Sequence, residues 1–311
     1  MDRLNASTRR NFLKQLVLAS GILALPISVQ SASKSIHTRK IPSTGLDLSI
    51  IGTGTWRTFN VGNDHQARLK RCEVLRTFFE MGGQMVDSSP MYGSAEEVLG
   101  FCLNRLGSIA EPLFSATKVW TSDTNEGRQQ IRDSHRLWGI PEFNLLQVHN
   151  LVNWRAHLDT LFQMKADGKL QYVGITTSHG RRHRDIENII VSEPIDFVQL
   201  TYHLQNREVE NRLLPASLEK GVAVIANRPF SGGDLFDDYQ RYPLPDWVKE
   251  FDCHNWAQFF LKFVISHPAI TCAIPATSRV DHMIENMGAG YGELPDDATR
   301  RKMLRHISAL H

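Results

Sequence analysis

The stretch LLQVHNLVNWRAHLDTLFQMKADGKLQYVGITT, from Leu145 to Thr177, decides the expected fold. It opens with an apolar run of strand length, Leu145–His149, and closes with another, Tyr172–Thr177. Between them, Arg155–Lys165 has the apolar spacing of an amphipathic helix, and Gly168 follows where a left-handed helix end is favourable. A strand, a helix and a second strand in this order form a crossover unit, in which the two strands run parallel.

The same strand-then-helix unit repeats along the chain. The expected strands are Leu48–Trp56, Gln84–Ser88, Leu113–Val119, Leu145–His149, Tyr172–Thr177, Phe197–Tyr202, Val222–Asn227 and Thr271–Pro275. The expected helices include Gln66–Met81, Ala95–Leu106, Glu126–Leu137, Arg155–Lys165, Val209–Lys220 and Trp256–Ser266. Eight such strands are typical of a closed barrel, and the length is close to the ~250 residues usual for that fold. The sequence therefore predicts an α/β protein with a (β/α)8 TIM barrel over residues 34–311.

A turn signal precedes the first barrel strand. Pro42-Ser43-Thr44-Gly45 lies between two short extended runs within Ile36–Leu48, and these residue types favour tight turns. We expect a small β-hairpin that closes the bottom of the barrel. The remaining sequence contains no linker or low-complexity tract, so we expect a single domain from residue 34 onward.

Residues 1–33 have the pattern of an export signal. The residues TRRNFLK at Thr8–Lys14 are similar to the twin-arginine motif, and an apolar stretch follows from Leu16 to about Val29. This stretch is shorter than the ~20 residues that span a bilayer, and small residues follow it where a peptidase can cut, after Ser31 or Ser33. We therefore expect a cleaved twin-arginine (Tat) signal peptide, export of the folded protein to the periplasm by the Tat machinery, and no stable membrane association afterwards. An uncleaved anchor is the alternative.

The composition is that of an ordinary globular domain. Of 311 residues, 41% are hydrophobic and 22% are charged, and the net charge is +2. Such a small net charge gives no bulk attraction to nucleic acids or acidic membranes. The four cysteines, Cys72, Cys102, Cys253 and Cys272, are widely spaced and form no C-x-x-C pair. We therefore expect isolated thiols, with neither a disulfide framework nor a metal site.

Polar residues gather at the expected carboxyl ends of three successive strands. Asp87 and Tyr92 follow the second strand, Lys118 ends the third and His149 ends the fourth. In a barrel of this kind these strand ends carry the chemistry. Singly, each residue has a structural explanation, such as a helix cap, loop packing, a surface ion pair or a hydrogen-bonded core histidine. Together they predict one site, because burying an aspartate and a lysine without pairing them costs several kcal/mol.

The set Asp87, Tyr92-Gly93, Lys118 and His149 resembles the catalytic tetrad of the aldo-keto reductases in spacing and in its placement at strand ends. The resemblance extends to Glu285-Asn286 and implies reduction of an aldehyde or ketone by hydride transfer from a nicotinamide cofactor. Tyr92 is then the general acid and base, and Lys118 is expected to lower its pKa from the unperturbed value of about 10. Asp87 is expected to hold Lys118, and His149 to orient the carbonyl.

The resemblance also implies a cofactor site at the ends of the later strands, with NADP(H) favoured over NAD(H). Ser231-Gly232-Gly233 suits a pyrophosphate, and Thr277-Ser278-Arg279 resembles a 2′-phosphate pocket. The sequence departs from the family where Thr176-Thr177 replaces a Ser-Asn pair and where Asn227 replaces a tyrosine that stacks on the nicotinamide. The residues expected to bind the cofactor are Thr176, Thr177, Gln199, Asn227, Pro229, Ser231, Gly232, Gly233, Leu235, Thr277, Ser278, Arg279, Glu285 and Asn286.

Residues just past several strand ends are expected to line a substrate pocket. They are Trp56, Met91, Trp120, Asn150 and Trp154. Such a lining suits an aromatic or apolar carbonyl compound as the small-molecule substrate, and packing of the tryptophans in the core is the alternative.

Two other functions stay open at the level of the sequence. Lys118 as a Schiff-base nucleophile would make the protein an aldolase that needs no cofactor. A barrel that binds the cofactor without turning it over would act as a sensor, and the departures at Thr177 and Asn227 favour that alternative. We expect a monomer that carries its cofactor before export, because the twin-arginine pathway moves folded proteins.

Overall fold

Eight parallel strands form a ring in residues 35–310, the part of the chain that the computed structural model describes. In chain order they are β3 (Thr53–Gly54), β4 (Met85–Asp87), β5 (Phe114–Val119), β6 (Leu145–His149), β7 (Tyr172–Thr176), β8 (Phe197–Thr201), β9 (Ala223–Asn227) and β10 (Ile270–Ala273). A bridge between Ile51 and Ala273 joins the two ends of the sheet, and the N–H of Gly52 donates to the carbonyl of Ala273 at 2.8 Å. The predicted barrel is confirmed.

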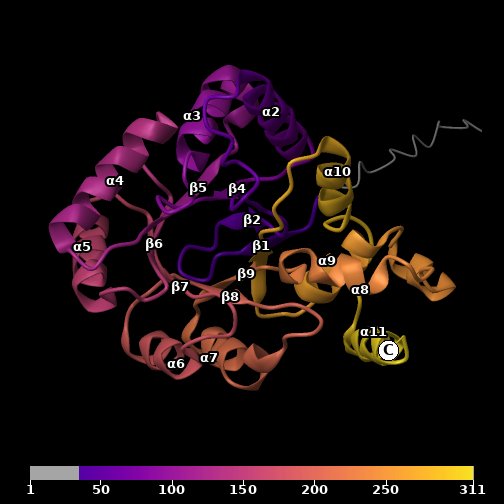
Figure 1. The fold of residues 1–311 in the computed structure, drawn as a ribbon. Helices are drawn as coiled ribbons and strands as arrows, with labels where there is room; N and C mark the ends of the chain where they lie inside the picture. Colours follow the sequence, from indigo (N-terminus) through magenta and orange to yellow (C-terminus); the bar gives the residue numbers. More distant parts are fainter. Residues whose placement is uncertain (1–34, 311) are drawn as a thin grey trace, which may run out of the picture. The chain divides into compact units, whose positions relative to one another are not determined.

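Helices follow the strands and surround the ring (Figure 1). The α-helices are α2 (His65–Glu80), α3 (Ala95–Leu106), α4 (Thr124–Trp138), α5 (Trp154–Ala166), α6 (His183–Ser192), α7 (Leu213–Lys220), α8 (Asp234–Tyr239), α9 (Trp256–Ile265), α10 (Val280–Gly288) and α11 (Asp297–Ser308). Short 3-10 turns are η1 (Gly107–Ala110), η2 (Glu208–Asn211), η3 (Ser231–Gly233) and η4 (Asp246–Phe251). The helix expected over Val209–Lys220 is divided into η2 and α7. Pro215 explains the division, because proline lacks a backbone N–H and is tolerated in the first turn of a helix.

The crossover unit from Leu145 to Thr177 forms as expected. Strands β6 and β7 pair in parallel, from Leu145 opposite Tyr172 to His149 opposite Thr176. Gly168 follows α5 with φ of 72°, a conformation that costs glycine little and residues with a Cβ more. The register places His149 beside Thr176 at the carboxyl edge of the sheet, where the functional site is expected.

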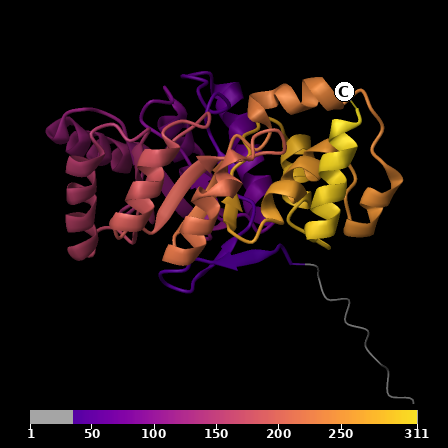
Figure 2. The ribbon, with the colours of Figure 1, turned by 90° about the horizontal axis from the view of Figure 1, so that it is seen from below.

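A β-hairpin lies at the end of the barrel opposite the carboxyl ends of the strands (Figure 2). Its strands, β1 (Thr38–Lys40) and β2 (Asp47–Ser49), pair antiparallel. Ile41 and Leu48 are buried in one cluster with residues of the barrel strands such as Phe114 and Phe197, so the hairpin closes the bottom as predicted. The single strand expected over Leu48–Trp56 is divided, because its first residues pair within the hairpin and only its later residues enter the barrel.

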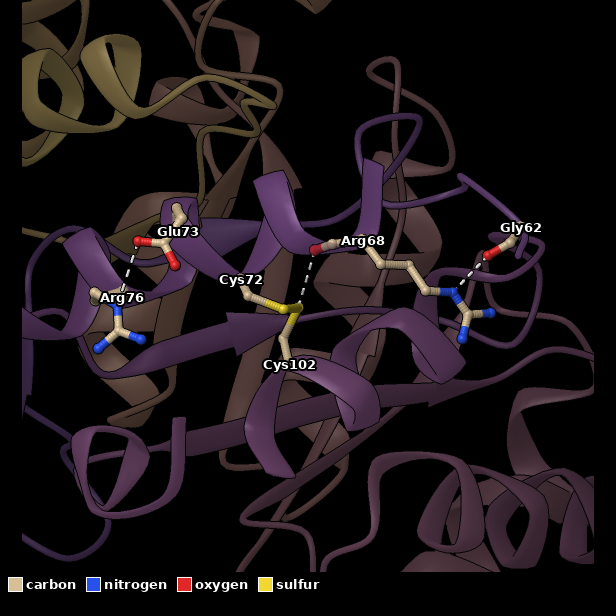
Figure 3. The surroundings of a disulfide bond; sticks show 6 residues. All are labelled: Gly62, Arg68, Cys72, Glu73, Arg76 and Cys102. Atoms are coloured by element: carbon tan, nitrogen blue, oxygen red, sulfur yellow. Dashed lines mark hydrogen bonds and ion pairs between the residues drawn. A yellow bond between two sulfur atoms is a disulfide. The ribbon is translucent and has the colours of Figure 1, made fainter. Parts of the chain in front are cut away.

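A disulfide joins α2 and α3 (Figure 3). It links Cys72 to Cys102, with 4.8 Å between their Cα atoms, within the usual range for a disulfide. The prediction of isolated thiols is therefore wrong for this pair, while Cys253 and Cys272 are free and buried. The two bonded cysteines are 30 residues apart, about the length of one strand-helix unit. Positions separated by one unit lie side by side on consecutive helices, which a search for short cysteine spacings overlooks.

The expected signal peptide, residues 1–33, lies outside the described part of the chain. Within residues 35–310, none of the helices combines the length and apolar character needed to cross a membrane.

Candidate active site

A cavity of about 450 Å³ opens at the carboxyl ends of the barrel strands. This volume falls within the range of about 300–1,000 Å³ that is usual for small-molecule sites. The site residues expected from the sequence that line it are Trp56, Asp87, Met91, Tyr92, His149, Asn150, Thr176, Gln199, Asn227, Pro229, Gly232 and Gly233. The structure therefore brings residues from distant parts of the sequence to one concave surface.

Asp87 and Lys118 form a buried ion pair between β4 and β5. The Nζ of Lys118 donates to Oδ2 of Asp87 at 2.6 Å and to the carbonyl of Ser88 at 2.7 Å. The side chains are 3% and 0% exposed, respectively. Burial alone would lower the pKa of Lys118, but the negative charge of Asp87 and its hydrogen bond to Lys118 oppose this effect, and the pKa is raised above its usual value. Lys118 is therefore held as an ammonium ion.

The second carboxylate oxygen of Asp87 accepts two further hydrogen bonds. The Nε2 atoms of Gln147 and Gln199 each donate to Oδ1 at 3.0 Å. The two amides also meet each other, because Nε2 of Gln199 lies 3.2 Å from Oε1 of Gln147. Together with the ion pair, these hydrogen bonds fix the carboxylate of Asp87 in place beside Lys118.

Tyr92 lies against this ion pair and faces the cavity. The Nζ of Lys118 is 5.2 Å from the centre of the Tyr92 ring. Burial raises the pKa of Tyr92, and although the charge of Lys118 lowers it, the net direction is upward. Lys118 thus acts on the pKa of Tyr92 in the expected direction, but burial is the larger effect and was not anticipated from the sequence. Tyr92 is a neutral phenol near pH 7, which is the form that can donate a proton.

His149 completes the group at the end of β6. Its ring meets that of Tyr92 edge to face, with 5.9 Å between the ring centres. Oγ of Ser89 lies 3.0 Å from Nδ1 of His149 and also accepts from the N–H of Met91 at 3.4 Å. Burial, with a smaller contribution from Lys118, lowers the pKa of His149 to about 2. The imidazole is therefore neutral. When the Ser89 hydroxyl donates to Nδ1, the proton of the imidazole ring lies on Nε2.

The loops around the cavity contain most of the left-handed backbone in residues 35–310. Residues other than glycine with positive φ follow β3, β6, β7 and β9, and they are Arg57, Asn150, Leu151, Asn153, His179, Arg182, Arg228 and Ser231, with Asp252 the exception elsewhere. Such conformations cost about 1–3 kcal/mol each and gather at functional sites. Their clustering at the carboxyl face of the barrel supports a functional site there.

The family follows from comparison with known proteins. Residues 50–302 match the model of the aldo/keto reductase family. The chain belongs to this family. It is therefore an NAD(P)H-dependent oxidoreductase that acts on carbonyl groups. A methylglyoxal reductase of Escherichia coli strain K12, YeaE, is 26% identical over 252 residues, which cover 78% of this chain and 86% of that protein. An uncharacterized oxidoreductase of Schizosaccharomyces pombe is 27% identical over 165 residues, 52% of each chain.

Solved structures have the same fold as this reductase. The aldo-keto reductase AKR11C1 from Bacillus halodurans, in its holo form, has a TM-score of 0.71 at 20% identity, covering 88% of this chain and 96% of that one. An aldo-keto reductase from Klebsiella pneumoniae in complex with NADPH has a TM-score of 0.71 at 21% identity, covering 88% and 95%. At these identities the likeness establishes the barrel and its topology.

The residues expected to hold the nicotinamide form a polar floor in the reductase. Nδ2 of Asn227 donates to the carbonyl of Thr177 at 2.8 Å, and Oδ1 of Asn227 accepts from Thr201 at 2.7 Å. Nδ2 of Asn227 also donates to Oε1 of Gln199 at 3.3 Å. Where the family has a stacking tyrosine, this chain thus has an amide that ties the ends of β7, β8 and β9 together.

The expected phosphate loop lies on the cavity wall. Gly232 and Gly233 have φ of 80° and 122° and both line the cavity. A Cβ on Gly232 would lie 3.1 Å from Nη2 of Arg228, so the guanidinium covers this glycine closely. A loop without side chains, beside an arginine, fits the pyrophosphate of a dinucleotide.

Some expected residues of the reductase do not line the cavity. The backbone of Trp120 is bonded in both directions to the side chain of Gln130, and Trp154 begins α5 and packs against the outer core. Arg279 is exposed and paired with Asp281. Also away from the lining are Lys118, Thr177, Ser231, Leu235, Thr277, Ser278, Glu285 and Asn286.

The structure brings further residues to the site that were not predicted from the sequence. Gln147 precedes His149 by two positions on β6, so strand alternation places both on the same face, and this signal was available. Ser89 stands between Asp87 and Tyr92 without a distinguishing pattern. Arg57, Arg181 and Arg228 also line the cavity, but their positions depend on loop conformations that sequence patterns do not reveal.

Proposed function

We propose that this reductase uses NADPH to convert aldehydes and ketones to alcohols, with Tyr92 as the proton donor. The observation that carries the proposal is the position of Tyr92 on the cavity wall beside the buried pair of Lys118 and Asp87, where burial raises the pKa of the phenol. The relatives from Klebsiella pneumoniae whose structures hold NADP or NADPH support the choice of cofactor, as do the glycine loop and Arg228 at the cavity wall.

Each member of the group has a distinct task in this mechanism. The neutral His149 donates from Nε2 to the carbonyl oxygen and orients it toward Tyr92. When bound, the reduced nicotinamide supplies the hydride to the carbonyl carbon. Tyr92 transfers its phenolic proton to the oxygen as negative charge develops there. The ammonium of Lys118 stabilises the phenolate that results, because an opposite charge favours the ionised form.

The Schiff-base alternative is disfavoured by the position of Lys118. A lysine nucleophile must be neutral, which requires a lowered pKa. Here the pKa of Lys118 is raised, its Nζ is bonded to Asp87 and Ser88, and it does not line the cavity.

The experiment follows NADPH absorbance while the purified mature protein reacts with an aromatic aldehyde. Tyr92→Phe removes the proton donor and is expected to lower kcat by 10²- to 10⁴-fold, the usual contribution of a general acid, while NADPH still quenches tryptophan fluorescence. Tyr242→Phe is the matched control, since Tyr242 does not line the cavity. A wild type that quenches with NADPH but never consumes it would support the sensor alternative instead.

The second part of the proposal is export in the folded state with the cofactor bound. The twin-arginine pattern at Arg9-Arg10 supports it, as does the Cys72–Cys102 disulfide, because disulfides persist mainly in oxidising compartments such as the periplasm. Replacing both arginines by lysine is expected to keep the protein in the cytoplasmic fraction. Recovery of the variant in the periplasm, or a periplasmic wild type without bound nucleotide, would contradict this part.

A further inference from the structure

The mouth of the cavity is strongly basic. Three arginines, Arg57, Arg181 and Arg228, line it, as does His179, whose lowered pKa leaves it neutral near pH 7. The one acidic residue in the lining is Asp87, and its charge is already neutralised by Lys118. The cavity therefore presents an excess of positive charge to whatever enters it, which favours an anionic ligand.

The three arginines differ in what they touch. Nη2 of Arg228 donates to the carbonyl of Ser231 at 3.2 Å and covers Gly232, so Arg228 belongs to the phosphate side of the cofactor site. The guanidinium of Arg57 stacks on the Trp56 ring, 4.3 Å from its centre. Among residues 35–310, the guanidinium groups of Arg57 and Arg181 have neither a hydrogen bond nor an ion pair. These two are available to a second anion.

The basic side chains form one electrostatic group. Burial lowers the pKa of His179, and the charges of Arg228 and Arg181 lower it further. Burial also lowers the pKa of Arg228. The charge of Asp234 opposes this lowering, and the charge of Arg57 adds to it. Oγ of Ser231 donates a hydrogen bond to Oδ2 of Asp234 at 3.0 Å. This carboxylate therefore does not pair with Arg57 or Arg181.

The backbone maintains this arrangement at a cost. Arg57, His179 and Arg228 have φ of 63°, 63° and 51°, and they lie in three different loops. Residues with a Cβ seldom adopt this conformation without a functional reason. Two of these loops, at Arg57 and Arg228, bring a positive charge to the same cavity, which favours the binding of negative charge there.

The rest of the lining limits what that anion is attached to. Trp56, Met91, Phe230, Phe236 and Ile274 give the cavity that contains the proton donor an apolar lining as well. We propose that the preferred substrates are carbonyl compounds with an apolar body and a carboxylate, whose charge Arg57 and Arg181 bind while the carbonyl reaches Tyr92 and His149. This inference rests on the proposed reductase function and names its substrate class.

The reaction balances without a further reactant. The carbonyl carbon gains the hydride of the reduced cofactor, its oxygen gains the proton of Tyr92, and the carboxylate is unchanged. The product is a hydroxy acid, and the cofactor leaves oxidised.

A matched pair of substrates separates the anion site from the reductase itself. 4-Carboxybenzaldehyde and its methyl ester differ in charge and share the reacting aldehyde. We expect the wild type to prefer the acid at least tenfold in kcat/KM, and Arg57→Gln with Arg181→Gln to remove that preference through a higher KM for the acid. Added salt should raise the KM of the acid and leave that of the ester unchanged, because screening weakens exposed charge pairs. Arg184→Gln, three residues after Arg181 but outside the cavity lining, is the control and should retain the preference.

Two outcomes would overturn the inference. An acid-to-ester ratio near one in the wild type would show that the mouth does not select for charge. An unchanged ratio together with about tenfold weaker NADPH binding in the double variant would show that the two arginines serve the cofactor phosphates. Benzoate binding to the NADP⁺ complex, followed by tryptophan fluorescence, tests the anion site separately. Loss of that binding in the double variant supports the site even if neither aldehyde is reduced, and its retention there overturns the assignment.

Discussion

Opening the Cys72–Cys102 bond should destabilise the barrel by an amount that the loop length sets. The bond closes a loop of 30 residues, and the chain-entropy relation gives about 3.6 kcal/mol for a loop of that length at 25 °C. For a domain of this size, 1 kcal/mol corresponds to about 2 °C in Tm. We therefore expect Tm to fall by about 7 °C on reduction of the wild type.

Thermal unfolding followed by circular dichroism, with and without a phosphine reductant, measures this shift. The double variant Cys72→Ala/Cys102→Ala should have a Tm at or below that of the reduced wild type, and the reductant should not change it. Any remaining shift in the Tm of this variant reports an effect of the reductant on Cys253 or Cys272. Titration of the denatured protein under air should find two free thiols per chain. Four thiols, or equal Tm values for the oxidised and reduced wild type, would refute the reasoning.

Two further predictions concern the chemistry. Ser89→Ala removes the hydrogen-bond partner of Nδ1 of His149 and should lower kcat about tenfold with little change in NADPH binding. Ser89→Thr keeps a hydroxyl and should restore the rate. Equal rates for the alanine variant and the wild type would exclude a positioning role for Ser89. The raised pKa of Tyr92 keeps the phenol protonated through neutral pH, so the rate of reduction should stay level from about pH 6 to 9 and fall only above the unperturbed value of about 10. The neutral His149, with its pKa lowered to about 2, should add no acid limb near pH 6, and a rate that falls by half between pH 7 and 6 would contradict the assignment of His149 as neutral.

Much of the fold could be predicted because the barrel repeats a local pattern. The unit from Leu145 to Thr177 contains a strand, a helix, a glycine helix end and a second strand, all of which depend on neighbouring residues. The tetrad could be predicted for a related reason, since parallel strands bring their carboxyl ends to one edge whatever the loops do. The division of the first strand at the hairpin was missed, because it depends on how the hairpin packs under the barrel.

Other features depend on contacts between distant residues. Cys72 and Cys102 pair because consecutive helices lie side by side, not because of a local spacing. The upward net shift in the pKa of Tyr92 depends on the depth of its burial, which outweighs Lys118. By contrast, the partners of Trp120 and Arg279, which are Gln130 and Asp281, lie near them in the sequence, but the strand and helix patterns do not reveal these contacts.

The bonds around Asp87 have an evolutionary consequence. Its carboxylate links side chains of β4, β5, β6 and β8, and removing it would leave the ammonium of Lys118 buried and unpaired, a change that costs about 3–5 kcal/mol. A descendant that abandoned catalysis could therefore not lose Asp87 alone without a large loss of stability. Tyr92 is not constrained in this way, because it makes none of these hydrogen bonds to the carboxylate of Asp87. Among relatives of this barrel, the residue at the position of Tyr92 should distinguish working reductases from barrels that have taken up another role.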